Sequence, residues 1–217
     1  IERVKRLRFV ADIAPHHVAQ EVAGQAALAG TVALLLTEND ARADVGENVV
    51  LILGANAGES LRVEAGSAAS ARVIAGSISG STAKAGVGAT IAVAERRDAA
   101  NAAVSAGSTV TAAGDVTIQS TAQNDIWAVT TADAVATGTG GAAIGGGVNV
   151  ILTGTTAQAV LGDGATIDAD GAFALNAQND TKFTLISADV GLGTGAAVAA
   201  GGTVAVLIHE NATIAEA

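Results

Sequence analysis

Three aspartates lie close together in one glycine-containing segment, where their carboxylates could bind a divalent cation. Asp163, Asp168 and Asp170 fall within residues 162–171, which read Gly-Asp-Gly-Ala-Thr-Ile-Asp-Ala-Asp-Gly. Calcium takes about six to eight oxygen ligands, and glycine- and aspartate-rich nonapeptides supply them by repeating in tandem. The matching segment one repeat earlier, residues 105–115, has a single acid, Asp115. The sequence therefore favours solvated turn carboxylates, with calcium kept as the candidate metal and no other cofactor expected.

The histidines are the next candidates for chemistry. They occur as His16-His17 and as His209 next to Glu210. Because neighbouring residues on a strand point to opposite faces, neither pair is a ready chelate. Serine, histidine and aspartate are all present, but no Gly-x-Ser-x-Gly elbow presents a serine nucleophile. We therefore assign no catalytic residue and expect a protein that is not an enzyme.

Glycine-rich runs at residues 138–141 and 191–195 superficially suggest phosphate-binding loops. Such a loop needs a helix that begins directly after it and usually a Lys-Ser or Lys-Thr pair, and neither follows here. Tight turns or close packing of backbones explain these glycines better.

The elements that would position these residues are copies of one repeat. A short apolar strand motif begins at four positions, separated by 59, 59 and 54 residues: Thr31, Thr90, Asn149 and Thr203. A second marker keeps nearly the same period, with separations of 54, 55 and 57, at residues 7–9, 61–63, 116–118 and 173–175. A fixed period of this size is typical of solenoids, propellers and arrays, whose units bury their apolar faces by stacking on neighbours.

The repeat reads as strands. Short runs rich in β-branched residues alternate with period two and end at Gly, Asn or Asp. The high alanine content argues against strands, because alanine is the best helix former. Residues 94–106 could be helical on propensity alone. We predict an all-β parallel β-solenoid built from about four copies of a 54–59-residue repeat, with an antiparallel β-hairpin array, turning at residues 137–140 and 193–195, as the alternative.

The copies are expected to form a single elongated repeat domain that is a fragment of a longer chain. Their approximate limits are 1–58, 59–113, 114–170 and 171–217. Each copy could make two or more rungs, or one long flattened coil with rungs about 4.8 Å apart, and the sequence leaves this open. Trp127 and Phe183 occupy similar places in two copies, which predicts a packed aromatic stack or an exposed ladder able to bind glycan.

Composition narrows the class further. Aromatic residues make up 2% of the chain, and Cys, Met and Tyr are absent, which suggests a thin core of small side chains. The net charge of −10 and the pI near 4.5 argue against a nucleic-acid partner. No apolar run reaches the roughly 20 residues needed to cross a bilayer, and no signal peptide opens the chain, so membrane insertion is not expected.

Three segments carry a resemblance to a known class of proteins. They read GDVTIQSTAQND, GTGGAAIGGGVNVILTGTTAQAVLGDGATI and GAFALNAQNDTKFTLISADVGLGTGAAVAAGGTVAVLIHENATI. They resemble the repeat regions of large bacterial filamentous haemagglutinin-like adhesins, in particular the leukotoxin-type filamentous adhesins. The likeness covers residues 107–217 well and 30–106 loosely, and residues 1–30 depart from it. It implies a right-handed parallel β-solenoid stalk that is exported to the bacterial surface and contributes to adhesion.

From the repeats and this resemblance we expect a structural stalk or repeat segment of a bacterial surface or secreted adhesin. Its expected partners are the neighbouring repeats, a second copy joined through strand edges into filaments, and a host-surface glycan or protein. Its expected location is extracellular or on the cell surface. The alternative is a polysaccharide-binding or polysaccharide-acting β-helix protein, which should concentrate carboxylates on one face, commonly beside aromatics.

Overall fold

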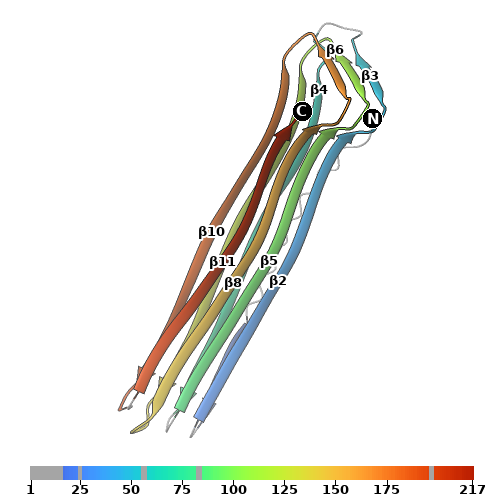
Figure 1. Ribbon diagram of the computed structural model, residues 1–217. Coiled ribbons are helices and arrows are strands. Elements are labelled where there is room, and N and C mark those ends of the chain that lie inside the picture. The colour runs from blue at the N-terminus through green and yellow to red at the C-terminus, as the bar shows by residue number, and fades with distance from the viewer. Residues whose placement is uncertain (1–16, 24–25, 55–57, 82–84, 196–197) are drawn as a thin grey trace.

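The computed structural model describes residues 17–217 except 24–25, 55–57, 82–84 and 196–197, and it describes side chains from Ala27 onward (Figure 1). Residues 7–9, Pro15 and His16 lie outside the described part. The described residues form strands and no helix: β1 (His17–Ala23), β2 (Ala26–Val45), β3 (Val50–Leu53), β4 (Leu61–Ser81), β5 (Ala85–Val104), β6 (Thr109–Ala112), β7 (Val116–Ala136), β8 (Ala142–Leu161), β9 (Thr166–Ala169), β10 (Phe173–Gly193) and β11 (Val198–Glu216).

These strands make three sheets whose pairings are all parallel. The two long sheets have the orders β1-β4-β7-β10 and β11-β8-β5-β2, and the short sheet has the order β3-β6-β9. The predicted parallel β-solenoid is therefore confirmed, and the alternative of antiparallel hairpins is wrong. The helix considered for residues 94–106 is also absent, because β5 runs through to Val104. Every second residue of β5 there points inward, and its alanines at these positions are buried between the sheets. Packing at these positions outweighs the helix propensity of alanine.

Each copy of the repeat is one flattened coil. The chain follows a long strand of the first sheet, turns, returns along a long strand of the second sheet, and closes through a short strand of the third (Figure 1). We call the end with the short strands the head and the opposite end, where residues 137–141 join β7 to β8, the tip. This answers the question that the sequence left open about rungs per repeat.

The observed strand pairing confirms the predicted alignment of one sequence marker and corrects that of the other. The marker at residues 116–118 is correct, because Val116 pairs with both Leu61 and Phe173. Thr31 likewise pairs with Thr90.

The predicted alignment of the strand motif in the third copy, however, is wrong by two residues. Asn149 pairs with Ala92, and the partner of Thr90 is Gly147. A shift of two residues preserves which side chains face inward, so the apolar pattern alone does not reveal it.

The interior changes in thickness from head to tip. At the head the three sheets enclose a core that includes Val104, Val110, Val116 and Ile118. Toward the tip the third sheet is absent and the two long sheets come together over alanine and glycine. A Cβ on Gly86 would lie 2.6 Å from the carbonyl oxygen of Val135, and one on Gly88 would lie 2.6 Å from that of Asp133. The backbone of β7 therefore leaves no room for a side chain at either of these two glycines.

Candidate functional site

A groove of about 570 Å³ crosses the outer face of the sheet β11-β8-β5-β2 near the middle of its strands. Strand register explains the hollow, because Ala99, Thr156 and Ala212 form one row of small side chains and Gly154 lies in the row beside it. Gly154 lies beside Arg97, and Ala99 beside Thr156. A Cβ on Gly154 would have no atom within 4 Å, so the floor of the groove is open above this glycine.

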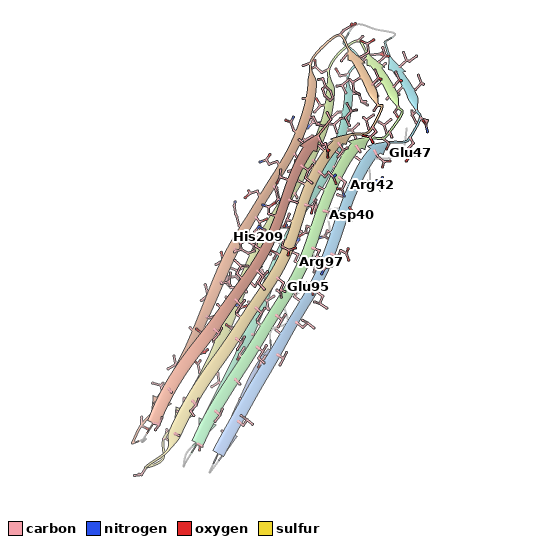
Figure 2. All side chains as sticks on the ribbon, viewed as in Figure 1. Asp40, Arg42, Glu47, Glu95, Arg97 and His209 are labelled. Atoms are coloured by element: carbon pink, nitrogen blue, oxygen red, sulfur yellow. The ribbon has the colours of Figure 1, made fainter. Side chains whose placement is uncertain are left out.

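Carboxylates surround this floor. Glu38 and Asp40 come from β2, Glu95 from β5 and Glu210 from β11. Arg97 is the exposed cation among them, and its guanidinium donates to the carboxylate of Glu95 at 3.1 Å. Figure 2 shows Asp40, Glu95 and Arg97 close together on adjacent strands. The Arg97 side chain is 73% exposed, so water screens the ion pair and it contributes at most about 1 kcal/mol.

Directly beneath the groove lies a second charged pair that is buried between the sheets. Arg96 and Asp98 occupy inward positions of β5, with side chains only 3% and 1% exposed. The Nε and Nη2 groups of Arg96 donate to the Asp98 carboxylate, which also accepts a hydrogen bond of 2.6 Å from the amide of Asn39 on the next coil. An ion pair in this position must be satisfied on all sides, because unpaired buried charge is very costly.

The same polar layer continues through the coils toward β11. Asn124 donates to the Thr155 hydroxyl at 2.9 Å, and Thr153 and His209 share a hydrogen bond of 2.7 Å. We call this set the interior polar layer: Asn39, Arg96, Asp98, Asn124, Thr153, Thr155, Asn179, Thr181, His209 and Asn211. In the sequence, these residues differ from surface polar residues only in their place in the period-two alternation of each strand, which assigns them to the inward face.

Other inward polar residues lie nearer the tip, Asn149 and Asp189 among them. Both amide atoms of Asn149 and both carboxylate oxygens of Asp189 are buried without a hydrogen bond of good geometry. Burial raises the pKa of the Asp189 carboxyl from its ordinary value of 3.8, and the charge of Asp133 adds to this, while nearby backbone groups of Ala132 and Gly147 act in the opposite direction. The Asp189 carboxylate sits where Gly147, lacking a side chain, leaves space.

The three calcium candidates are exposed and are not gathered around one point. Asp163 lies in the turn after β8, Asp168 on β9, and Asp170 directly after β9. Within the residues that the structure describes, no group of three or more His, Cys, Asp or Glu side chains is placed to hold a metal ion. Calcium binding at these aspartates remains a prediction.

The histidine and aromatic expectations have different outcomes. His209 faces the interior while Glu210 lines the groove, so the expected opposite orientation is confirmed. The aromatic stack is wrong, because Trp127 pairs with Thr184 and Phe183 pairs with Ile126. The offset of one residue places the two rings on opposite faces of the sheet.

Phe183 lies in the interior instead, with its ring 5.1 Å from that of His209 in an edge-on arrangement. His17 begins β1 and its side chain is outside the described part.

The groove residues offer chemistry for binding. Carboxylates and one guanidinium offer hydrogen bonds to hydroxyl groups and attraction to cations. The lining contains no aromatic residue against which a sugar ring could stack.

Comparison with known families, with curated proteins and with solved structures gives no match. In the described part of the chain, no helix has the length and apolar character to cross a membrane.

Proposed function

We propose that the chain is a structural, non-enzymatic segment of a bacterial surface or secreted adhesin. The observation that carries this proposal is the continuous parallel register of the coils. All twenty-one residues of β4 and of β10 pair one to one with β7. Every coil thus provides a template for the next, which is how repeat proteins add length.

The same register gives the segment its mechanical role. Long runs of backbone hydrogen bonds join each coil to its neighbours, and alanine and glycine let the two sheets lie in contact toward the tip. The expected partners are further coils of the same kind, and the expected place is outside the cell. Protease treatment of intact cells that produce the protein should release its peptides, and release only after lysis would contradict the surface location.

A role in adhesion adds a host-surface glycan or protein as the ligand. Cells that carry a parent protein lacking residues 114–170 should adhere less to host-cell monolayers while displaying the protein at an equal level. Equal adherence by both strains would separate this segment from the adhesive function.

The acidic groove favours a second candidate, polysaccharide binding. Its carboxylates lie on one face and come from three strands, β2, β5 and β11, as a β-helix protein acting on polysaccharide would require. A glycan array combined with a hydrolysis screen distinguishes the candidates. Binding that Glu95→Gln and Glu210→Gln weaken, without turnover, would support the second candidate, and turnover of any polysaccharide would overturn the non-enzymatic proposal.

A further inference from the structure

The half of the same outer face nearer the tip is entirely apolar. Four rows of outward positions on four strands hold only aliphatic residues and glycine. We call these positions the apolar face: Leu28, Gly30, Val32, Leu34, Val87, Ala89, Ile91, Val93, Ile144, Gly146, Val148, Val150, Ala200, Gly202, Val204 and Val206. The charged side chains labelled in Figure 2 lie nearer the head.

These side chains are open to solvent even on the inner strands. Ile91 on β5 is 43% exposed and Ile144 on β8 is 47% exposed, and the values on β2 reach 66% at Leu28 and Val32. Strands about 4.8 Å apart and a rise of about 3.3 Å per residue give the face roughly 500–600 Å². A patch of this size is at the upper end of what monomeric proteins expose.

The shape of the apolar face is complementary to itself, because a row of small residues lies next to a row of β-branched residues. One row consists of Gly30, Ala89, Gly146 and Gly202 and forms a trough across the strands. The adjacent row, two residues along each strand, consists of the β-branched residues Val32, Ile91, Val148 and Val204 and forms a ridge. The space above the trough is open, since a Cβ on Gly202 would meet no atom within 4 Å.

We propose that two copies of this chain pair face to face through the apolar face, with their tips pointing in opposite directions. A two-fold axis between the ridge and the trough, perpendicular to the strands, places the ridge of each copy in the trough of the other. The two faces together would bury roughly 1,000–1,200 Å², which lies at the lower limit of specific protein interfaces.

Charge selects this orientation over the one with tips together. Toward the head the outer face of the sheet is acidic, because carboxylates outnumber guanidinium groups: Glu38, Asp40, Asp44, Glu95, Glu210 and Glu216 against Arg42 and Arg97. Tips together would place these acidic regions against each other. With the tips pointing in opposite directions, each acidic region lies beyond the paired apolar faces, where water solvates it.

The pairing goes beyond the proposed structural role, and the partner is a second copy because the ridge and trough match each other. Every coil adds one more ridge position and one more trough position along the same axis. The interface therefore grows with the number of coils, and two solenoids of any length remain in contact.

Sedimentation velocity of the full chain tests the proposal. We expect a reversible dimer with a Kd on the order of micromolar, because an interface of this size lies at the weak end of specific complexes. Ile91→Asp should raise Kd at least about tenfold, because it places a charge at the centre of the interface. The control is Ile186→Asp on the outer face of β10, where the isoleucine is similarly exposed at 46%, and it should leave Kd unchanged. A monomeric wild type, or a dimer that Ile91→Asp does not weaken, would overturn the proposal.

A second variant separates ridge-in-trough pairing from general hydrophobic adhesion. Gly146→Val makes the face more apolar and is tolerated in the monomer, where the nearest atom to the new Cβ is the Gly202 carbonyl oxygen at 3.9 Å. It fills the trough and should weaken the dimer, with circular dichroism confirming an unchanged strand content. A tighter dimer, or association with phosphatidylcholine and phosphatidylglycerol vesicles in place of dimerisation, would instead show a generic adhesive or lipid-binding surface.

The orientation has its own measurement. The chain has no cysteine, so Asp163→Cys introduces a single site for a spin label in an exposed turn at the head. Opposed tips place the two labels at opposite ends of the dimer, farther apart than about 66 Å, the length of a 20-residue strand. A short inter-label distance would overturn the proposed orientation.

Discussion

At the scale of single residues, the most consequential feature is the buried ion pair of Arg96 and Asp98. Its outward neighbour Arg97 pairs with Glu95 on the opposite face of the same strand. The two arginines are adjacent in sequence and share a partner type, yet one is enclosed and the other is solvated. They form a natural matched pair for measuring what burial does to a charge.

Arg96→Met should lower the free energy of unfolding by about 3–5 kcal/mol, because it leaves the Asp98 carboxylate buried without its cation. Arg97→Met should change it by less than about 1 kcal/mol. Urea denaturation monitored by circular dichroism measures both, and the double variant Arg96→Met with Asp98→Asn should recover part of the loss. Equal effects of the two methionine variants would contradict the buried pair.

Asp189 makes stability depend on pH in the direction opposite to that of a paired carboxylate. Its folded-state pKa is raised above 3.8, so the folded protein holds this proton more tightly than the unfolded chain does. Its contribution therefore favours folding most at low pH and is lost as pH rises from 3.8 through the raised folded-state pKa.

Asp189→Asn should accordingly raise the free energy of unfolding at pH 7, because the neutral amide removes the buried charge that the raised pKa reflects. Below pH 3.8 the difference from the wild type should shrink toward zero. Thermal unfolding across this pH range is the measurement. Asp125→Asn, on the outer face of β7, serves as the control, and a constant difference at all pH values would argue against titration of Asp189 as the cause.

At the scale of elements, the long strands alternate inward and outward side chains over about twenty residues. The kind of inward residue changes along the strand from the head to the tip. Valine and isoleucine are prominent in the filling of the head, and the interior polar layer comes next. An aliphatic cluster that includes Val73, Ile126 and Ile151 follows, and small residues, alanine, glycine, serine and threonine, fill the part toward the tip. Glycine in a strand normally weakens it. Here the inward glycines toward the tip are required by the contact between the two sheets.

Two glycines of β8 test this requirement. Gly145→Ala would place a Cβ against the carbonyl oxygens of Ala132 and Val190, whereas a Cβ on Gly154 meets nothing within 4 Å. Gly145→Ala should lower the free energy of unfolding by about 1–3 kcal/mol, as overpacking does. Gly154→Ala should have little effect or stabilise the strand. Urea midpoints compare the two, and similar values would mean that the sheets separate freely near the tip.

The strands were predictable from sequence because period-two alternation and turn residues are local signals. The marker at residues 61–63, 116–118 and 173–175 even gave the correct pairing between coils. The groove was not predictable, since Glu95, Gly154 and Glu210 become neighbours only after the register between coils is known to the residue. The alignment of Asn149 failed for this same reason. The stack of Trp127 on Phe183 was already incompatible with the correct marker, whose spacing of 57 residues places Trp127 opposite Thr184.

At the scale of the whole molecule, the long dimension lies along the strands and not along the stack of coils (Figure 1). A strand of 20 residues spans about 66 Å, whereas each added coil increases the stack by about 4.8 Å. The four coils therefore form a blade that is long, thin and shallow. The proposed stalk lengthens slowly with each repeat and gains a broad surface.

Inserting a second copy of residues 114–170 after residue 170 should therefore leave the maximum dimension of the monomer almost unchanged. The cross-section should thicken by about 5 Å, one strand spacing. Small-angle X-ray scattering of the Ile91→Asp background, with and without the insertion, measures both quantities. An increase of tens of ångströms in maximum dimension would indicate separately folded copies.

The layered interior also constrains how a gene for such a protein can change in length. The kinds of inward residue differ along each coil from the head to the tip. A coil that slid far enough along its neighbour would therefore set the Arg96 guanidinium against glycines near the tip. Unequal recombination between repeats therefore yields a foldable product only when it gains or loses a whole circuit of the chain. Frame-preserving exchanges that begin and end at different depths would be removed by misfolding, and lineages should differ by entire circuits.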